Sequence, residues 1–192
     1  MKFNMGCGRR KIPGFINVDA QSQCDPDEVF DLEKTPWPWP DNCADEVQFI
    51  HALEHMGGDP QVFLEIVQEV YRISAPDCRI VVKVPHPRHD NFISDPTHVR
   101  PITPDTWRLF DCELNDQALS AGGSNTPLGR YLGVDLVLEE HGITLEEPFW
   151  SQYQRGEITN QTIEQLLRER NNIAREFSFV LRARKPMASQ PV

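Results

Sequence analysis

Two glycines near the start of the chain and two acids further on could hold a ligand that contains a nucleoside. Gly6-Cys7-Gly8 follows a short apolar run, and a turn without side chains lets backbone N–H groups approach a ligand. The next apolar run ends at Asp19, whose carboxylate could accept hydrogen bonds from a ribose diol. The third run is followed by Asp31 and Leu32, and this carboxylate could accept from an adenine amino group. Each residue could instead be a plain turn or cap residue.

Five of the six histidines follow the fourth and fifth apolar runs: His51, His55, His86, His89 and His98. If these runs are parallel strands, the histidines share the edge of the sheet where ligands of such folds bind. An imidazole can take a proton from an alcohol at neutral pH. We predict that His51, His98 or His86 acts as a base or binds the substrate, with His51 also near the cofactor. A hydrogen-bonded structural role is the alternative for each.

The segment from His86 to Arg100 offers two further kinds of site. Its imidazoles and carboxylates could bind a divalent metal, but no His-x-x-x-His pair organises them, so we expect no metal. Asp95 and Arg100 are candidates for binding the substrate, since an arginine can hold an anionic group with two hydrogen bonds, although a surface ion pair is as compatible. Trp37 and Trp39 could stack on adenine or a sugar, but core packing is the commoner use of such residues.

Short apolar runs rich in β-branched or aromatic residues predict the strands that position these groups. There are seven: Lys2 to Met5, Phe15 to Val18, Glu28 to Phe30, Glu46 to Ile50, Arg79 to Val84, Leu136 to Glu140 and Phe177 to Ala183. The clearest helix has Asp59 as its N-cap and Pro60 at its first position, and Pro76 stops it. A second helix is predicted from Ile158 to about Arg175.

Strands that alternate with helical segments predict an α/β fold, a Rossmann-like, seven-stranded, mostly parallel sheet with helices on both faces. Only about nine residues, Gly6 to Gly14, join the first two strands, so the first crossover is too short for a full helix. We assign residues 1–186 to a single domain and 187–192 to a disordered tail. Segments of about 86–133 and 144–175 should provide a lid and select the substrate.

The composition argues against several classes of protein. Nineteen basic and 29 acidic residues give a formal charge of −10, which disfavours nucleic acid as the main partner. The five cysteines are widely spaced without a Cys-x-x-Cys pair, so reduced thiols are expected. No apolar run approaches the roughly 18 residues of a membrane span, and the first residues do not read as a secretory signal. We therefore expect a cytoplasmic protein.

Taken in order, the motifs resemble the class I S-adenosylmethionine-dependent methyltransferases, most closely the small predicted methyltransferases of the Leu-Glu-His group, which are type 11-like. The resemblance covers nearly the whole chain and rests on Gly6-Cys7-Gly8, Asn17-Val18-Asp19, Asp31-Leu32-Glu33, Trp37 to Asn42, Asp45-Glu46-Val47, His51 to His55 and Phe63 to Pro85. It implies S-adenosylmethionine as cofactor. The glycine turn would face the methionine part, Asp19 the ribose, and Asp31 with Leu32 the adenine.

The chain departs from the family pattern at three places. Asn4 stands where the family often has an acid, Arg10 stands where a third glycine is expected, and Asp77-Cys78 replaces a glycine pair. With the short first crossover, the methionine end of the cofactor is expected to be either more exposed or covered by another element. The change at Asp77-Cys78 is expected to affect only a turn.

The resemblance implies methyl transfer to a small molecule or a glycan. Oxygen is slightly preferred over nitrogen as acceptor, because the histidines could remove a proton from an alcohol. A module that binds S-adenosylmethionine or S-adenosylhomocysteine without catalysis is the main alternative. An NAD-dependent oxidoreductase is less compatible, because the crossover helix that presents a pyrophosphate to its N-terminus is missing.

Overall fold

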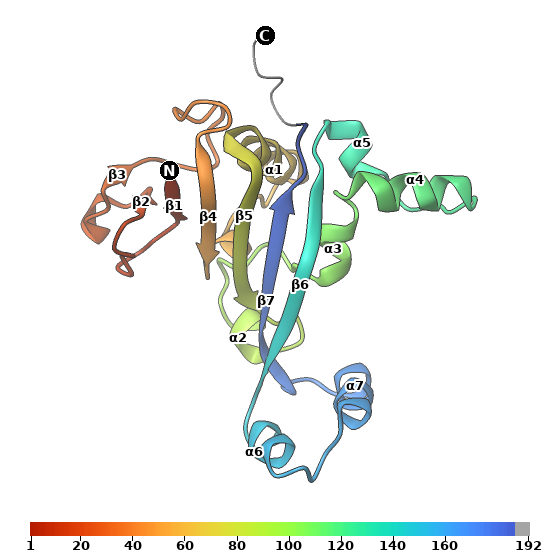
Figure 1. The fold of residues 1–192 in the computed structure, drawn as a ribbon. Helices are drawn as coiled ribbons and strands as arrows, with labels where there is room; N and C mark the ends of the chain where they lie inside the picture. Colours follow the sequence, from red (N-terminus) through yellow and green to blue (C-terminus); the bar gives the residue numbers. More distant parts are fainter. Residues whose placement is uncertain (187–192) are drawn as a thin grey trace.

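The computed structural model describes residues 1–186, and its centre is a seven-stranded sheet (Figure 1). The strands are β1 (Lys2–Met5), β2 (Ile16–Asp19), β3 (Glu28–Val29), β4 (Ala44–Ile50), β5 (Ser74–Pro85), β6 (Leu136–Leu145) and β7 (Ala174–Ala183). Their order is β3-β2-β1-β4-β5-β7-β6, and β7 runs antiparallel to both of its neighbours. All seven predicted strands and the mostly parallel sheet are confirmed.

The helices are α1 (Pro60–Ile73), α2 (Asp90–Ile93), α3 (Pro104–Arg108), α4 (Cys112–Ser120), α5 (Leu128–Leu132), α6 (Phe149–Gln154) and α7 (Asn160–Glu169), with short 3-10 turns η1 (Ser22–Cys24) and η2 (Leu53–His55). Helix α1 begins as predicted, because Asp59 Oδ1 accepts from the backbone N–H of Gln61. The predicted extension of α7 to Arg175 is wrong. Asn172 has a φ of 59°, and Ala174 already pairs in β7.

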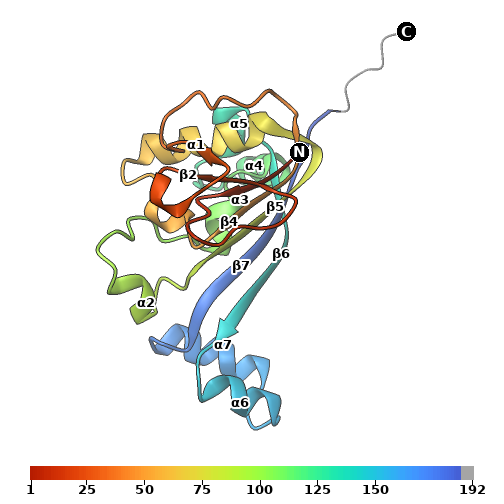
Figure 2. The same cartoon turned by 90° about the vertical axis from the view of Figure 1, so that its left-hand side faces the viewer.

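The main core lies between the sheet and α1. Val47, Phe49 and Val82 alternate with less buried residues along their strands, and they pack with Ile66 and Val70 of α1. Helices α1 and α3 lie on the same face of the sheet, as the turned view in Figure 2 shows. The α/β, Rossmann-like sheet with covering helices is as predicted.

The short first crossover is confirmed, and side-chain hydrogen bonds hold it in place of a helix. Asn4 Nδ2 donates to the carbonyl of Arg10 at 2.8 Å and to Asn17 Oδ1 at 2.9 Å. Asn17 Nδ2 in turn donates to Asp27 Oδ2 at 2.6 Å. Asn4 and Asn17 are both buried. These amides give the loop's polar groups partners that a helix would otherwise supply.

Strands β6 and β7 continue past the end of β5 and carry α6 and α7 beyond the main body (Figure 1). A second, small apolar cluster holds this extension together: Leu145, Ile163, Ile173 and Ala174. In contrast, the glycine-rich part of the predicted lid, residues 121–133, lies at the opposite end of the sheet. There Leu132 accepts from Gln68 Nε2, and β6 starts against the end of β7. No helix of residues 1–186 is long and apolar enough to cross a membrane.

Candidate functional site

The carboxyl ends of β1, β4 and β5 meet at one edge of the sheet. Gly6, which follows β1, adopts a φ of 65°, and a Cβ added to it would lie 2.5 Å from Ala52 Cβ. Glycine is therefore required here both for its conformation and for the close approach of the two segments. This contact places the glycine turn directly beside the residues that follow β4.

Asp19 at the end of β2 faces the glycine turn. Its Oδ2 accepts from the backbone N–H of Gly8 at 2.7 Å, and its Oδ1 accepts from that of Gln21 at 2.8 Å. A Cβ added to Gly8 would meet no atom within 4 Å, so the space next to this turn is open. The thiol of Cys7 is buried, which raises its pKa and keeps it protonated. A ribose could still approach the remaining lone pairs of Asp19.

The two residues predicted to frame adenine behave differently. Asp31 lies at the surface, accepts from the backbone N–H of Glu33 at 3.1 Å and lies 3.5 Å from Lys34 Nζ. The side chain of Leu32 is buried in the core. Trp37 donates to the Leu32 carbonyl through its indole at 3.0 Å. Trp39 donates to Glu28 Oε2 at 2.9 Å, so both tryptophans serve the core.

A pocket of about 340 Å³ opens where β4, β5 and β7 meet. Its walls come from segments far apart in the chain: His51, Glu54, His55, Pro85, Asn91, His98, Arg175 and Glu176. Larger hollows lie between α3 and α4 (about 820 Å³) and beside the end of α1 (about 570 Å³), away from this edge. The smaller pocket gathers three of the predicted histidines, so we assign the candidate site to it.

His51 lies between two carboxylates in this pocket. Its Nε2 is 2.7 Å from Glu176 Oε2 and its Nδ1 is 3.5 Å from Glu54 Oε1. The carboxylates of Glu54 and Glu176 raise the pKa of His51 above its ordinary value. His51 also has a φ of 55°, a conformation that costs a non-glycine residue about 1 kcal/mol or more. The backbone of His51 at the end of β4 is therefore strained, and it positions the imidazole in the pocket.

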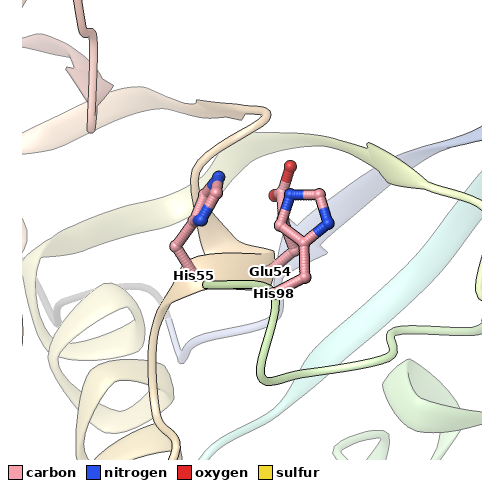
Figure 3. Close-up of side chains that lie close together, drawn as sticks. All are labelled: Glu54, His55 and His98. Carbon is pink, nitrogen blue, oxygen red and sulfur yellow. The ribbon is translucent and has the colours of Figure 1, made fainter. Parts of the chain in front are cut away.

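His55 and His98 also lie close to Glu54, as Figure 3 shows. His98 comes from the loop between α2 and α3, which is fixed to η2 because Val99 and Arg100 donate their backbone N–H groups to the Glu54 carbonyl. The two imidazole rings have centroids 4.5 Å apart. The end of β4 and the loop after β5 are therefore parts of one site in the structure.

Other predicted residues lie outside the pocket walls. His86 is buried against the ring of Phe177 with its Nδ1 accepting from the backbone N–H of Arg88 at 3.2 Å. Arg100 donates to the Gly57 carbonyl, and its guanidinium carbon Cζ lies 4.6 Å from the centre of the Phe63 ring. Asp95 is closer to the site, because its Oδ2 is 3.8 Å from His98 Nε2. Their predicted roles as base or substrate ligands stay predictions.

Sequence reasoning missed Glu176 and gave Glu54 no role of its own. Glu54 is only 1% exposed, and its Oε2 has no hydrogen-bond partner among the described residues. Glu176 reaches the pocket because β7 is antiparallel, so the start of β7 pairs with Pro85 at the end of β5. Extending the predicted strand by one residue before Phe177 would have included Glu176.

Comparison with protein-family models and with curated proteins gives no match. Solved structures do match. An S-adenosylmethionine-dependent methyltransferase from Archaeoglobus fulgidus is 23% identical with a TM-score of 0.57, covering 94% of this chain and 85% of that one. A second such methyltransferase, from Methanosarcina mazei, is 11% identical with a TM-score of 0.56, over 96% and 92%. The [4+2]-cyclase SpnF is 13% identical with a TM-score of 0.52, over 97% and 75%.

These matches and the strand order show that the chain has the class I S-adenosylmethionine-dependent methyltransferase fold. The fold implied by the sequence resemblance is confirmed. Because SpnF shares the fold and is described as a cyclase, the fold alone does not specify a reaction.

Proposed function

We propose that this protein is an enzyme that transfers a methyl group from S-adenosylmethionine to a small-molecule or glycan acceptor. The observation that carries the proposal is the contact between Gly6 and Ala52. It puts an open glycine turn and the ribose candidate Asp19 on one side, and a pocket lined with histidines and carboxylates on the other. A cofactor site and an acceptor site would then be neighbours, as methyl transfer requires.

The residues at this edge fit the cofactor in part. Backbone groups of Gly6, Cys7 and Gly8 would face the methionine portion, Asp19 would accept from the ribose, and Asp31 would lie near the adenine. S-adenosylmethionine supplies a methyl group on a sulfonium, which needs no further activation beyond alignment with the acceptor. The buried side chain of Leu32 is not available to the adenine, so only its backbone could contribute there.

An oxygen acceptor is preferred over a nitrogen acceptor because the pocket holds groups that can take a proton. The Nδ1 of His98 is 3.0 Å from the Phe92 carbonyl, so this nitrogen donates and Nε2 is left as a proton acceptor. His51 faces Glu54 and Glu176, which favour its charged form, so it accepts a proton only after one of these contacts is released. His98 is therefore the better-placed base of the two.

Calorimetric titration of the purified protein with S-adenosylmethionine, S-adenosylhomocysteine and NAD tests the cofactor. We expect micromolar binding of the first two and none of NAD. A screen of alcohol and amine acceptors with labelled methyl donor then tests transfer. Failure to bind either S-adenosyl compound would contradict the proposal.

A second candidate is a module that binds the cofactor without transferring the methyl group. The lack of a helix in residues 6–15 favours it, because the methionine end of the cofactor loses a wall that would position the sulfonium. Binding of S-adenosylmethionine without labelled product from any acceptor class would support this alternative. His51→Ala and His98→Ala separate the two further, since a catalytic role lowers turnover more than cofactor affinity.

The location in the cell and the class of partner remain proposals on the same basis. We infer a cytoplasmic protein whose partners are its cofactor and a small or glycan acceptor. Fractionation of cells that express the full chain tests the location.

A further inference from the structure

Glu54, His55 and His98 lie close enough together to share one ion. One ligand atom of each lies within 4.8 Å of the others, and Figure 3 shows the three side chains gathered at η2 and the adjoining loop. Ligand atoms about 2.1 Å from a tetrahedral metal are roughly 3.4 Å apart. Movement of the exposed His55 side chain would have to close most of this difference.

The buried carboxylate of Glu54 supplies an independent indication. Glu54 is 1% exposed, and its Oε2 has no hydrogen-bond partner among residues 1–186. A buried carboxylate oxygen without a partner is costly, because its hydration is lost and nothing replaces it. A cation bound between Glu54 and the two imidazoles would supply the missing partner.

Hydrogen bonds at Nδ1 of both histidines determine which ring nitrogen carries the proton and which one is free to bind a metal. His98 Nδ1 is 3.0 Å from the Phe92 carbonyl, so it must carry the proton and Nε2 is free to coordinate. His55 Nδ1 is 2.8 Å from Thr97 Oγ1, and the Thr97 hydroxyl is 2.6 Å from Asp95 Oδ1. Because the Thr97 proton goes to Asp95, His55 Nδ1 also donates. Such outer partners orient metal-bound histidines in proteins.

From this geometry we propose that Glu54, His55 and His98 form a binding site for a divalent transition metal of the zinc type. Two imidazoles and one carboxylate are a ligand set that suits zinc, iron and related ions. Three protein ligands leave a position open for water or for a substrate oxygen in the pocket. Asp95 and Glu176 add negative charge nearby, and Arg175 opposes it.

This site differs from the one the sequence allowed for. Of the groups in residues 86–98, only His98 belongs to it, and both other ligands come from η2. Bound to a metal, His98 would be a ligand and not the base. The proposal does not depend on methyl transfer, because the three ligands would bind the ion with or without the cofactor.

Cobalt provides the direct test, because its visible absorption reports ligand number and type. We would remove metals from the untagged full-length protein with a chelator, titrate it with Co²⁺, and displace the cobalt with Zn²⁺. One equivalent should bind and give a visible band without a thiolate band in the near ultraviolet. A thiolate band would place the ion at the cysteines, and the absence of saturable binding would equally overturn the proposal.

Variants identify the ligands. His98→Gln and Glu54→Gln should weaken binding at least about 100-fold, since loss of an outer partner alone typically costs 10- to 100-fold. His55→Gln should do the same and is at the surface, so it tests the site even if Glu54→Gln does not fold. Thr97→Val should weaken binding about tenfold. His141→Gln removes an exposed imidazole on β6 and should change nothing.

The outcomes separate this proposal from the proposed function. Equal cobalt binding by the wild-type protein and the His55, His98 and Glu54 variants would overturn the metal site. Cobalt binding that depends on these residues, without binding of S-adenosylmethionine, would support the site and contradict methyl transfer.

Discussion

Asp19 illustrates how one side chain both shapes a turn and remains available to a ligand. Its two oxygens accept backbone N–H groups from Gly8 and Gln21, which fix the glycine turn relative to β2. A carboxylate oxygen has two lone pairs, so ribose hydroxyls could donate to the positions that remain. The same hydrogen bonds mean that a truncating substitution would disturb both the turn and the ligand.

We predict that Asp19→Asn lowers affinity for S-adenosylhomocysteine by about 1–3 kcal/mol, because a charged acceptor is replaced by a neutral one that keeps a single oxygen. Calorimetric titration measures this change, and urea denaturation monitors the turn. Asp25→Asn is the matched control, because Asp25 is exposed and its φ of 53° suits asparagine. An unchanged affinity in Asp19→Asn would remove Asp19 from the ribose site.

His86 provides a pH-dependent prediction at the same scale. Burial, helped by the nearby charges of Arg88 and His89, lowers the pKa of His86 from its ordinary 6.5 to about 4. The unfolded chain therefore binds a proton that the folded chain excludes between these values, so this residue makes stability fall as the pH falls from 7 towards 4. At pH 5 the loss should be about 1–2 kcal/mol.

Urea denaturation of the wild type and His86→Phe between pH 7 and pH 5 measures this contribution as a difference in slope. The phenylalanine cannot titrate and keeps a ring against Phe177. His141→Phe, at an exposed position on β6, should keep the wild-type slope. If His86→Phe also keeps it, the imidazole is protonated in the folded protein and the interpretation is wrong.

At the scale of elements, the loop between β1 and β2 stands in for a helix. Asn4 and Asn17 supply its buried hydrogen bonds, and both Asn4 partners, the Arg10 carbonyl and Asn17 Oδ1, are acceptors. The acid that the resembled family often has at position 4 could not donate to either. The asparagine at position 4 and the short crossover therefore belong together, because the Asn4 amide holds the loop that replaces the helix.

We predict that Asn4→Asp destabilises the fold by about 1–3 kcal/mol, because buried acceptors lose their donor and face a carboxylate. Urea denaturation at pH 7 measures it. Asn42→Asp is the matched control, since the Asn42 side-chain oxygen accepts from Lys185 Nζ at 2.7 Å and an aspartate can do the same. Equal stability of the two variants would mean that the Asn4 amide does not hold the loop.

At the scale of the whole molecule, the extension formed by α6, α7 and the ends of β6 and β7 has its own small core. The cluster of Leu145, Ile163, Ile173 and Ala174 lies apart from the main core under α1. Arg175 and Glu176, at the base of this extension, also line the candidate pocket. Opening of the extension would therefore displace Arg175 and Glu176 of β7 and alter the pocket.

We predict that Ile163→Ala opens this extension without unfolding the body. Loss of a buried isoleucine side chain costs about 2–4 kcal/mol, and it should appear as faster amide exchange in α6 and α7 while β4 and β5 keep their protection. Hydrogen exchange measured by mass spectrometry tests this prediction. Ile66→Ala in α1, within the main core, should instead speed exchange throughout. Uniform acceleration in Ile163→Ala would show one cooperative unit.

Local patterns were sufficient to predict the strands, the start of α1 and the short first crossover. Alternation of apolar residues, the Asp59 cap and the nine-residue connection act over a few neighbouring residues, and the sequence displays them directly. The same holds for the glycine turn and Asp19, which are consecutive strand ends. The end of α7 was misjudged because strand pairing of Ala174 with β6, a long-range contact, decides it.

Only the tertiary structure decided what lies together in the pocket. Glu54 and His98 are 44 positions apart, and the loop that carries His98 reaches η2 through backbone hydrogen bonds to the Glu54 carbonyl. Glu176 arrives from the last strand because β7 runs antiparallel. Residue types and strand ends are local properties that can be read from the sequence. The loops come together through long-range contacts, which form only when the whole sheet has formed.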